Sequence, residues 1–251
     1  DFTRFSYNIG GNLAATAPGA YSQADRTVIK GAMALPQITP GYYITPKVSF
    51  QSNTYNVTPY NPVGAPAAQG FTIPTFSLDS GLAFERDAAE LKGFYGRDML
   101  LTMEPRAFYV YTPFESQAQT PLFDTADAGF GVSQIFSENT FVGNDRVADN
   151  NKVTFGITSR VLDADTGIER LRGVLAQRVD LEGQRVTLTT QPQQKRSDLL
   201  AGLSTRLIGN FNLDGLVQYN DQISKLVQQS VTASYRPEMR KLLNLSYKRT
   251  K

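Results

Sequence analysis

The stretch Leu100–Pro113, "LLTMEPRAFYVYTP", decides the fold class of this chain. Apolar and aromatic residues recur at every second position, which is the period of a β-strand with one apolar face. Glu104 and Arg106 are two residues apart, so their charged side chains share the opposite face. Pro105 lies on the apolar face and has no N–H group. We therefore expect a missing ladder hydrogen bond or a β-bulge at this proline.

The same two-residue period extends over most of the chain. It predicts an all-β fold, an antiparallel meander of about eleven strands. We place these strands at residues 3–15, 27–35, 42–54, 75–85, 99–112, 152–162, 170–181, 199–207, 211–220, 226–236 and 242–248. Most of them approach the ~9–11 residues that a tilted strand needs to cross a bilayer. One helical turn is expected in a connection, within Arg86–Phe94.

The connections between these strands fall into two sets. The first set is short and comprises residues 36–41, 87–96, 163–167, 208–210 and 237–240. The second set is mostly long and comprises residues 16–26, 55–74, 113–151, 182–198 and 221–225. Because strands in a meander alternate in direction, the two sets lie at opposite ends of the sheet. Short turns at one end and long loops at the other are typical of an outer-membrane β-barrel.

The charged residues separate by face. The apolar face of the predicted strands carries no Asp, Glu, Lys or Arg, although Arg86, Glu169 and Arg249 share its parity just outside the strands. Positive residues dominate the other face, at Arg4, Lys30, Lys47, Arg106, Lys152, Arg160, Arg170, Arg172, Arg178, Arg206, Arg236 and Lys248. The negative residues on that face are Asp79, Glu85, Glu104, Asp180 and Asp214. A Lys or Arg at mid-bilayer costs about 2–4 kcal/mol, so this pattern predicts a lipid-facing apolar side and a basic inner wall.

The composition of the 251-residue chain excludes several classes of enzyme. The chain has no cysteine, which excludes disulfides and thiolate nucleophiles, and no histidine, the commonest general base. Hydrolases built on Ser-His or Cys-His pairs are excluded. We expect a protein without enzyme activity, with no cofactor, no bound metal and no nucleic-acid partner.

The pattern alone leaves two alternatives to a transmembrane barrel with a specialised transport function. A soluble β-sandwich would bury the apolar face between two sheets, and a porin-like passive channel would share the barrel. Long strands favour the barrel over the sandwich, as do aromatic residues at strand ends. These aromatic residues are Tyr42, Phe84, Tyr109, Tyr111, Tyr219 and Tyr235. Because bacterial barrels have even strand numbers, we expect residues 1–251 to be a single-domain segment of a larger barrel.

Three stretches together resemble one protein family. They are Leu100–Pro113, Phe76–Asp87 ("FSLDSGLAFERD") and Phe141–Asp163 ("FVGNDRVADNNKVTFGITSRVLD"). They resemble the mid-barrel region of the lipopolysaccharide-assembly LptD family, also called the organic solvent tolerance protein family. The resemblance implies a translocon that assembles lipopolysaccharide into the outer leaflet of the Gram-negative outer membrane.

The resemblance also implies partners and further parts. An amino-terminal periplasmic β-jelly-roll receives lipopolysaccharide from a periplasmic Lpt bridge, the lipoprotein LptE plugs the lumen, and lipid leaves between the first and last strands. Residues 1–251 depart from that pattern, because they contain no jelly-roll, none of the family's disulfide cysteines and neither of the gate strands. In this interpretation those functions belong to parts outside the segment, and outer-membrane lipid surrounds the wall.

Six residues of the inner face are candidate contacts for substrate or plug: Glu104, Arg106, Arg160, Arg170, Arg172 and Arg178. Glu104 and Arg106 could form a solvated or laterally paired cluster, contact the plug, or contact substrate. The four remaining arginines lie on two adjacent strands, and grouped guanidinium groups suit phosphate and carboxylate recognition. They could attract phosphorylated glycolipid or an acidic face of the plug, or form an ordinary charged lining.

The long loop 113–151 is acidic. It carries Asp124, Asp127, Glu138, Asp145 and Asp149. Carboxylates of this kind can bind Ca²⁺ or Mg²⁺, but the spacing of an EF-hand is absent. We expect instead an extracellular lid or a loop that folds inward.

Overall fold

A computed structural model describes most of the chain. The described residues are 2–6, 21–59, 68–129, 131–188, 199–206, 210–220, 225–238 and 241–250. No helix in these ranges is long and apolar enough to cross a membrane. The predicted strand 3–15 is seen only at its beginning, because residues 7–20 lie outside the described part.

The strands form one antiparallel sheet in the order β1-β2-β4-β5-β7-β10-β11-β12-β13-β14-β15. Their bounds are Phe2–Ser6 (β1), Tyr21–Ala34 (β2), Tyr42–Pro59 (β4), Ala68–Leu82 (β5), Met99–Thr112 (β7), Asn150–Asp163 (β10), Glu169–Asp180 (β11), Leu199–Arg206 (β12), Phe211–Asn220 (β13), Lys225–Glu238 (β14) and Lys241–Thr250 (β15). Two short strands join the sheet, β3 (Gln37–Ile38) beside β4 and β6 (Phe84–Asp87) beside β7. The predicted meander of about eleven strands is therefore confirmed.

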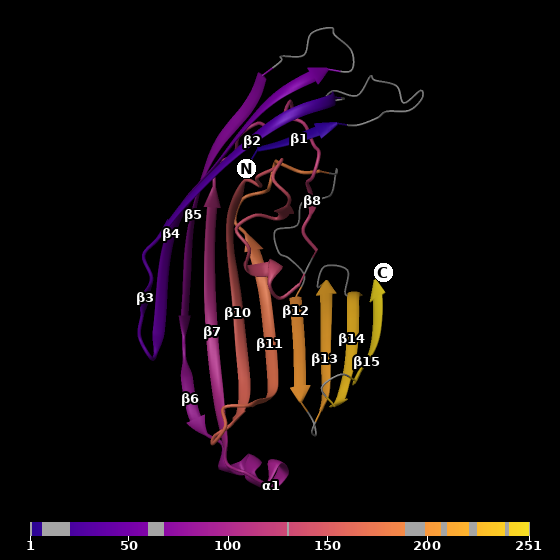
Figure 1. The fold of residues 1–251 in the computed structure, drawn as a ribbon. Coiled ribbons are helices and arrows are strands. Elements are labelled where there is room, and N and C mark those ends of the chain that lie inside the picture. The colour runs from indigo at the N-terminus through magenta and orange to yellow at the C-terminus, as the bar shows by residue number, and fades with distance from the viewer. Residues whose placement is uncertain are drawn as a thin grey trace.

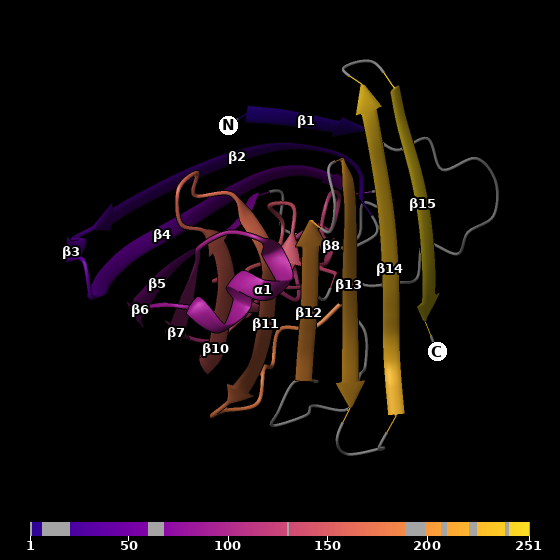
Figure 2. The same ribbon diagram turned by 90° about the horizontal axis from the view of Figure 1, so that it is seen from below.

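The sheet is a single curved layer (Figure 1). Seen from below it is an open arc, with β1 and β15 as its two edges in the described part of the chain (Figure 2). The predicted helical turn is present as the 3₁₀ helix η1 (Ala89–Leu91) and the helix α1 (Lys92–Tyr95), which connect β6 to β7. In the described part of the chain the only other sheet is the two-stranded pairing of β8 (Ala126–Asp127) with β9 (Phe141–Val142) in the long loop, so no second layer of comparable size packs against the curved sheet.

The apolar face, called the outer face below, is uncovered over much of its area. Val48, Phe155, Leu203 and Val231 are each about half exposed, at 53%, 57%, 53% and 46%. Soluble monomers rarely expose a contiguous apolar surface of this kind, and a sandwich would have buried it. The soluble β-sandwich alternative is therefore not favoured, and the outer face corresponds to the side that lipid covers in a barrel.

Three strands extend further toward the long-loop end than the pattern predicts. β2 begins at Tyr21, β4 ends at Pro59 and β5 begins at Ala68, inside the predicted connections 16–26 and 55–74. In these extensions the apolar residues lie on the inner face, where Ala24, Tyr55, Phe71, Ile73 and Val147 form a small core. The pattern misses the extensions because the apolar residues change faces there.

Pro105 interrupts the ladder on one side of β7. The β10 side is continuous, and Pro105 lies opposite Ile157. On the other side Gly81 pairs with Arg106 and Phe84 pairs with Met103, while the two residues between Gly81 and Phe84 do not pair with β7. The register is the same on both sides of this gap, so the proline removes ladder pairing without a bulge.

Candidate functional site

The long loop, residues 113–149, folds against the charged inner face of the sheet. It contains β8 (Ala126–Asp127), the 3₁₀ helix η2 (Gln134–Phe136) and β9 (Phe141–Val142). Glu138 accepts hydrogen bonds from Lys47 Nζ at 3.0 Å and from Ser77 Oγ at 2.6 Å. Thr154 Oγ1 donates to the carbonyl oxygen of Ile135 at 3.0 Å. Of the two arrangements expected for this loop, the inward fold is the one observed.

Arg26 anchors this inward loop at the long-loop end of β2. Its guanidinium group is 2% exposed and donates to Asp145 Oδ1 at 2.7 Å and to Asp124 Oδ2 at 2.8 Å. Tyr55 also donates to Asp145, at 2.9 Å. A buried charge is tolerated only when it is paired, so the two carboxylates hold the loop and neutralise the charge of the arginine together.

The pKa of Asp124 reflects this anchor. Partial burial opposes its charge, but hydrogen bonds from Arg26 and from the N–H of Asn144 outweigh burial and hold the pKa of the carboxyl well below its usual range. The described residues contain no group of three carboxylates arranged to hold a metal ion. Asp124, Glu138 and Asp145, three of the acidic residues of the loop, bind cationic side chains of the sheet.

Glu104 and Arg106 are paired across strands and not with each other. Arg106 binds Asp79 of β5 in two places, Nε to Oδ1 at 2.8 Å and Nη2 to Oδ2 at 2.6 Å. The same guanidinium carbon lies 4.2 Å from the centre of the Phe136 ring of the inward loop. Glu104 forms an ion pair with Arg160 of β10. Of the three interpretations offered for this pair, lateral pairing is the one that the geometry supports.

Arg160 and Arg172 lie directly opposite each other on β10 and β11. Glu169 bridges them, with Oε2 3.3 Å from Arg160 Nε and Oε1 3.2 Å from Arg172 Nε. A register shift between Val161 and Leu162 turns Glu169 toward this side. The expectation that Glu169 shares the parity of the apolar face is therefore wrong, because the bulge inserts one residue.

Arg170 and Arg178 lie apart from that bridge. Arg170 Nη2 is 3.4 Å from Asp163, which also binds Arg97 Nη1 at 2.7 Å. Arg178 Nε is 3.7 Å from Asp180. The four arginines therefore do not form one uncompensated basic wall. Each has a carboxylate neighbour, because strand register and the bulge bring acidic residues between them.

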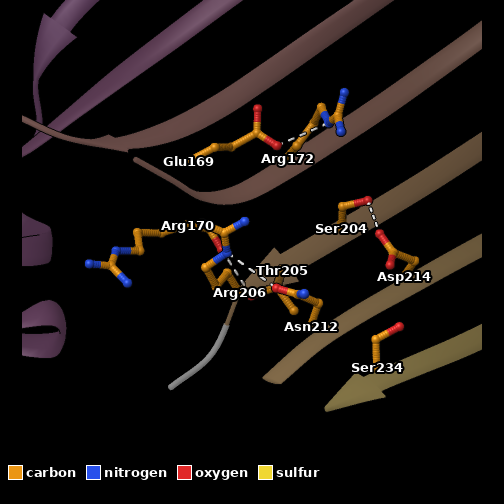
Figure 3. A pocket seen from close by; sticks show the side chains of 9 residues that line it. All are labelled: Glu169, Arg170, Arg172, Ser204, Thr205, Arg206, Asn212, Asp214 and Ser234. Carbon is orange, nitrogen blue, oxygen red and sulfur yellow. Dashed lines mark hydrogen bonds and ion pairs between the residues drawn. The ribbon is translucent and has the colours of Figure 1, made fainter. Parts of the chain in front are cut away.

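From β11 onward the inner face carries two adjoining polar grooves near the short-turn end. The first, of about 290 Å³, is lined by Glu169, Arg170, Arg172, Ser204, Thr205, Arg206, Asn212, Asp214 and Ser234 (Figure 3). The second, of about 380 Å³, is lined by Arg206, Asn210, Asn212, Ser234, Arg236, Leu242 and Asn244. In Figure 3 Ser204 and Asp214 point toward each other and the Arg170 side chain extends away from them.

Arg206 lines both grooves, and Arg236 lines only the second. Arg206 Nε donates to Asn212 Oδ1 at 3.2 Å. Among the residues that the structure describes, neither arginine lies within ion-pair distance of a carboxylate, and the second groove has no acidic lining residue. Charge alternation placed both arginines on the inner face, but the sequence carries no signal that separates them from the paired arginines of β10 and β11.

Comparison with known proteins places the whole chain in one family. The family described as "LPS transport system D" matches residues 1–251. The LPS-assembly protein LptD of Cupriavidus pinatubonensis is 45% identical over 255 residues, covering 99% of this chain and 30% of the relative. The LptD of Cupriavidus metallidurans is 46% identical over 253 residues, with the same coverage. The LptD of Paraburkholderia xenovorans is 41% identical over 237 residues, covering 92% of this chain and 30% of the relative.

The chain thus spans about 30% of the length of these curated relatives. The match extends beyond the three stretches that carried the resemblance. The chain belongs to the LptD family, and its strands form part of an outer-membrane β-barrel of Gram-negative bacteria.

Proposed function

We propose that the protein to which this chain belongs assembles lipopolysaccharide into the outer leaflet of the outer membrane. The match to the LptD family over residues 1–251 carries this proposal. In it, the chain supplies the middle of the barrel wall, and it acts by transport and not as an enzyme. The jelly-roll domain and the strands that close the barrel belong to other parts of the protein.

The two grooves on the inner face of β11–β15 are the proposed contact for the phosphorylated saccharide part of lipopolysaccharide. Guanidinium groups bind phosphate through charge-assisted hydrogen bonds. Arg206 and Arg236 suit this role because neither forms an ion pair with a described carboxylate, and the second groove has no acidic lining residue. The asparagine and serine side chains beside them provide donors and acceptors for sugar hydroxyl groups.

The proposed partners follow from family membership. The plug lipoprotein LptE occupies the part of the lumen that residues 113–149 leave free, and the periplasmic Lpt bridge delivers lipopolysaccharide through the jelly-roll. A porin-like passive channel is not favoured, because the family match names a system for lipopolysaccharide transport.

The test uses the full-length protein in a strain whose own copy is depleted. Arg206→Glu with Arg236→Glu reverses two charges without breaking an ion pair to a described carboxylate. We expect surface lipopolysaccharide to fall while the amount of folded protein in the outer membrane is unchanged. The matched control, Arg206→Lys with Arg236→Lys, keeps the charges and should retain most export.

Two results would argue against the proposal. If surface lipopolysaccharide is unchanged in the charge-reversed variant, the two grooves do not contribute to export. Depletion that lowers small-solute uptake and leaves surface lipopolysaccharide intact removes the transport function itself and favours a porin-like channel.

A further inference from the structure

The inner face carries three lysines that the sheet does not neutralise. Each described arginine of β7, β10 and β11 lies beside a carboxylate of the sheet. By contrast, Lys30 on β2, Lys47 on β4 and Lys152 on β10 have ammonium groups whose hydrogen-bond partners, in the described part of the chain, all belong to the inward loop. The sheet alone would therefore leave these three positive charges without a bound carboxylate.

Lys47 and Lys152 belong to one row of residues across four strands, called the lysine row below. Neighbours in this row lie directly opposite each other, in the pairs Lys47–Ser77, Ser77–Val110 and Val110–Lys152. Residues opposite each other point to the same face of a sheet, so the row presents two ammonium groups with a hydroxyl group between them. Ammonium and hydroxyl groups are donors that bind oxyanions. Beyond Lys152 the next residue is Asp180, which lies beside Arg178.

Glu138 of the inward loop occupies the lysine row. Its carboxylate accepts hydrogen bonds from Lys47 at 3.0 Å and from Ser77 at 2.6 Å, and its backbone carbonyl oxygen lies 3.4 Å from Lys152 Nζ. One residue of the loop therefore meets all three donors, and it supplies a single negative charge to two ammonium groups. A phosphate monoester carries about −1.5 to −2 charges and three acceptor oxygens at pH 7, so it matches the row better than one carboxylate does.

The contact of Glu138 with the lysine row is open to water, whereas the loop is anchored elsewhere. The Lys47 and Glu138 side chains are 36% and 26% exposed, and an ion pair that water reaches contributes little to stability. On either side along the chain, Ile135 and Asp145 are 1% and 0% exposed and hold the loop on the sheet. The Glu138 side chain can therefore turn away from the row while the loop stays in place.

We propose that the lysine row is a phosphate-binding site, which Glu138 fills in this structure and leaves when a phosphate monoester binds Lys47 and Ser77. The inference rests on the proposed function, which supplies the phosphorylated saccharide of lipopolysaccharide as the ligand. The row shares no residue with the lining of either groove, so it is a second phosphate contact on the wall. Glu138 thereby acts as an internal competitor that keeps the row occupied between substrates.

The test uses the full-length protein with its natural partners in living cells. A photo-crosslinking amino acid replaces Ser49, which lies two residues from Lys47 on the same face, and lipopolysaccharide attached after irradiation is measured. Glu138→Gln removes the competing charge and keeps the shape of the side chain. We expect about tenfold more attached lipopolysaccharide, which corresponds to about 1.4 kcal/mol of lost competition. Lys47→Gln removes the cation and should lower the amount.

These two substitutions separate binding from a structural role. Both break the same ion pair, so a contact that only stabilises the loop would change crosslinking in the same direction in both variants. A binding site requires opposite directions. If Glu138→Gln reduces the amount of folded barrel, Lys47→Gln still tests the site through the expected decrease.

Glu115→Gln is the matched control. Glu115 is an exposed residue of the same loop and lies within ion-pair distance of no cation in the described ranges. The substitution therefore removes the same charge from the loop without freeing a lysine of the sheet. Crosslinking at Ser49 should remain as in the natural protein.

A second crosslinking position, Ser234 in the grooves, separates this inference from the proposed function. Crosslinks at Ser234 with none at Ser49 would overturn the role of the lysine row and leave the proposed function standing. No crosslink at either position would remove the proposed function as well.

Three further results would overturn the inference. Changes in the same direction in Glu138→Gln and Lys47→Gln reduce Glu138 to a structural contact. An equal increase in Glu115→Gln shows that crosslinking follows the net charge of the loop and not the lysine row. In the purified complex, loss of the crosslinks on addition of millimolar inorganic phosphate assigns the row to free phosphate and not to the glycolipid.

Discussion

The inner face of this wall has two regions of opposite character. From β2 to β11 the inward loop, residues 113–149, covers the face, and its carboxylates bind cations of the sheet. From β12 to β15 no described loop neutralises the face, and Arg206 and Arg236 line an open groove. Both regions follow the same two-residue period. The difference teaches that alternation assigns a charge to a face, whereas the long loop decides whether that charge is available to a ligand.

Among the variants considered, Arg26→Ala is expected to destabilise the covered region most. Arg26→Ala leaves Asp145 and Asp124 without their cation inside the covered region. Removing one partner from a buried ion pair typically costs about 3–5 kcal/mol, so we expect the inward loop to detach. Protease cleavage within residues 113–149 and the urea midpoint of the folded barrel would measure the loss. Lys30→Ala, which removes only the exposed contact to Asn144, is the control and should leave the loop protected.

Acid should also weaken the attachment of the inward loop to the sheet, but by less than Arg26→Ala does. The folded state lowers the pKa of Asp124 below its ordinary value of 3.8. Its contribution is therefore fully present above that value and is lost as the pH falls through the lower folded value. We expect equal protease protection of the loop at pH 7 and pH 5, and loss of protection only in stronger acid. A loss between pH 7 and pH 5 would contradict the assignment of the anchor to Asp124.

Glu169 should have a more moderate effect. Glu169→Gln leaves Arg160 and Arg172 opposite each other without the bridging carboxylate. The three side chains are between 31% and 44% exposed, so water screens the repulsion and the cost should be about 1 kcal/mol. Denaturant unfolding of Glu169→Gln, of Arg172→Ala and of the variant with both changes completes a double-mutant cycle. Purely additive effects would show that the bridge does not exist in the folded barrel.

The smallest effect on stability is expected in the uncovered region. Arg206→Ala removes a cation that binds no described carboxylate, so the free energy of unfolding should change by less than about 0.5 kcal/mol. Lys47→Ala in the covered region removes the ion pair to Glu138 and should cost more. Equal costs for the two variants would erase the proposed distinction between the regions.

The sequence predicts the sheet better than it predicts the site. The pattern located the meander and the face of each candidate residue, because side chains alternate with a period of two in any strand. It missed Arg26 and Tyr55, since the predicted loops include them, and it placed Glu169 on the wrong face. In both cases a local irregularity, a change of the apolar face or a bulge, altered the parity on which the prediction depends.

By itself, the sequence determined the fold class, the family, the charged inner face and the apolar outer face. The fold class and the two faces depend on residue order within single strands, where the two-residue period shows, whereas the family followed from the resemblance of three stretches. Only the tertiary structure decided that the long loop folds inward, that Glu169 bridges two arginines and that Glu138 occupies the lysine row. These contacts depend on strand register, on the bulge beside Glu169 and on the folding of the long loop, none of which the period within one strand determines.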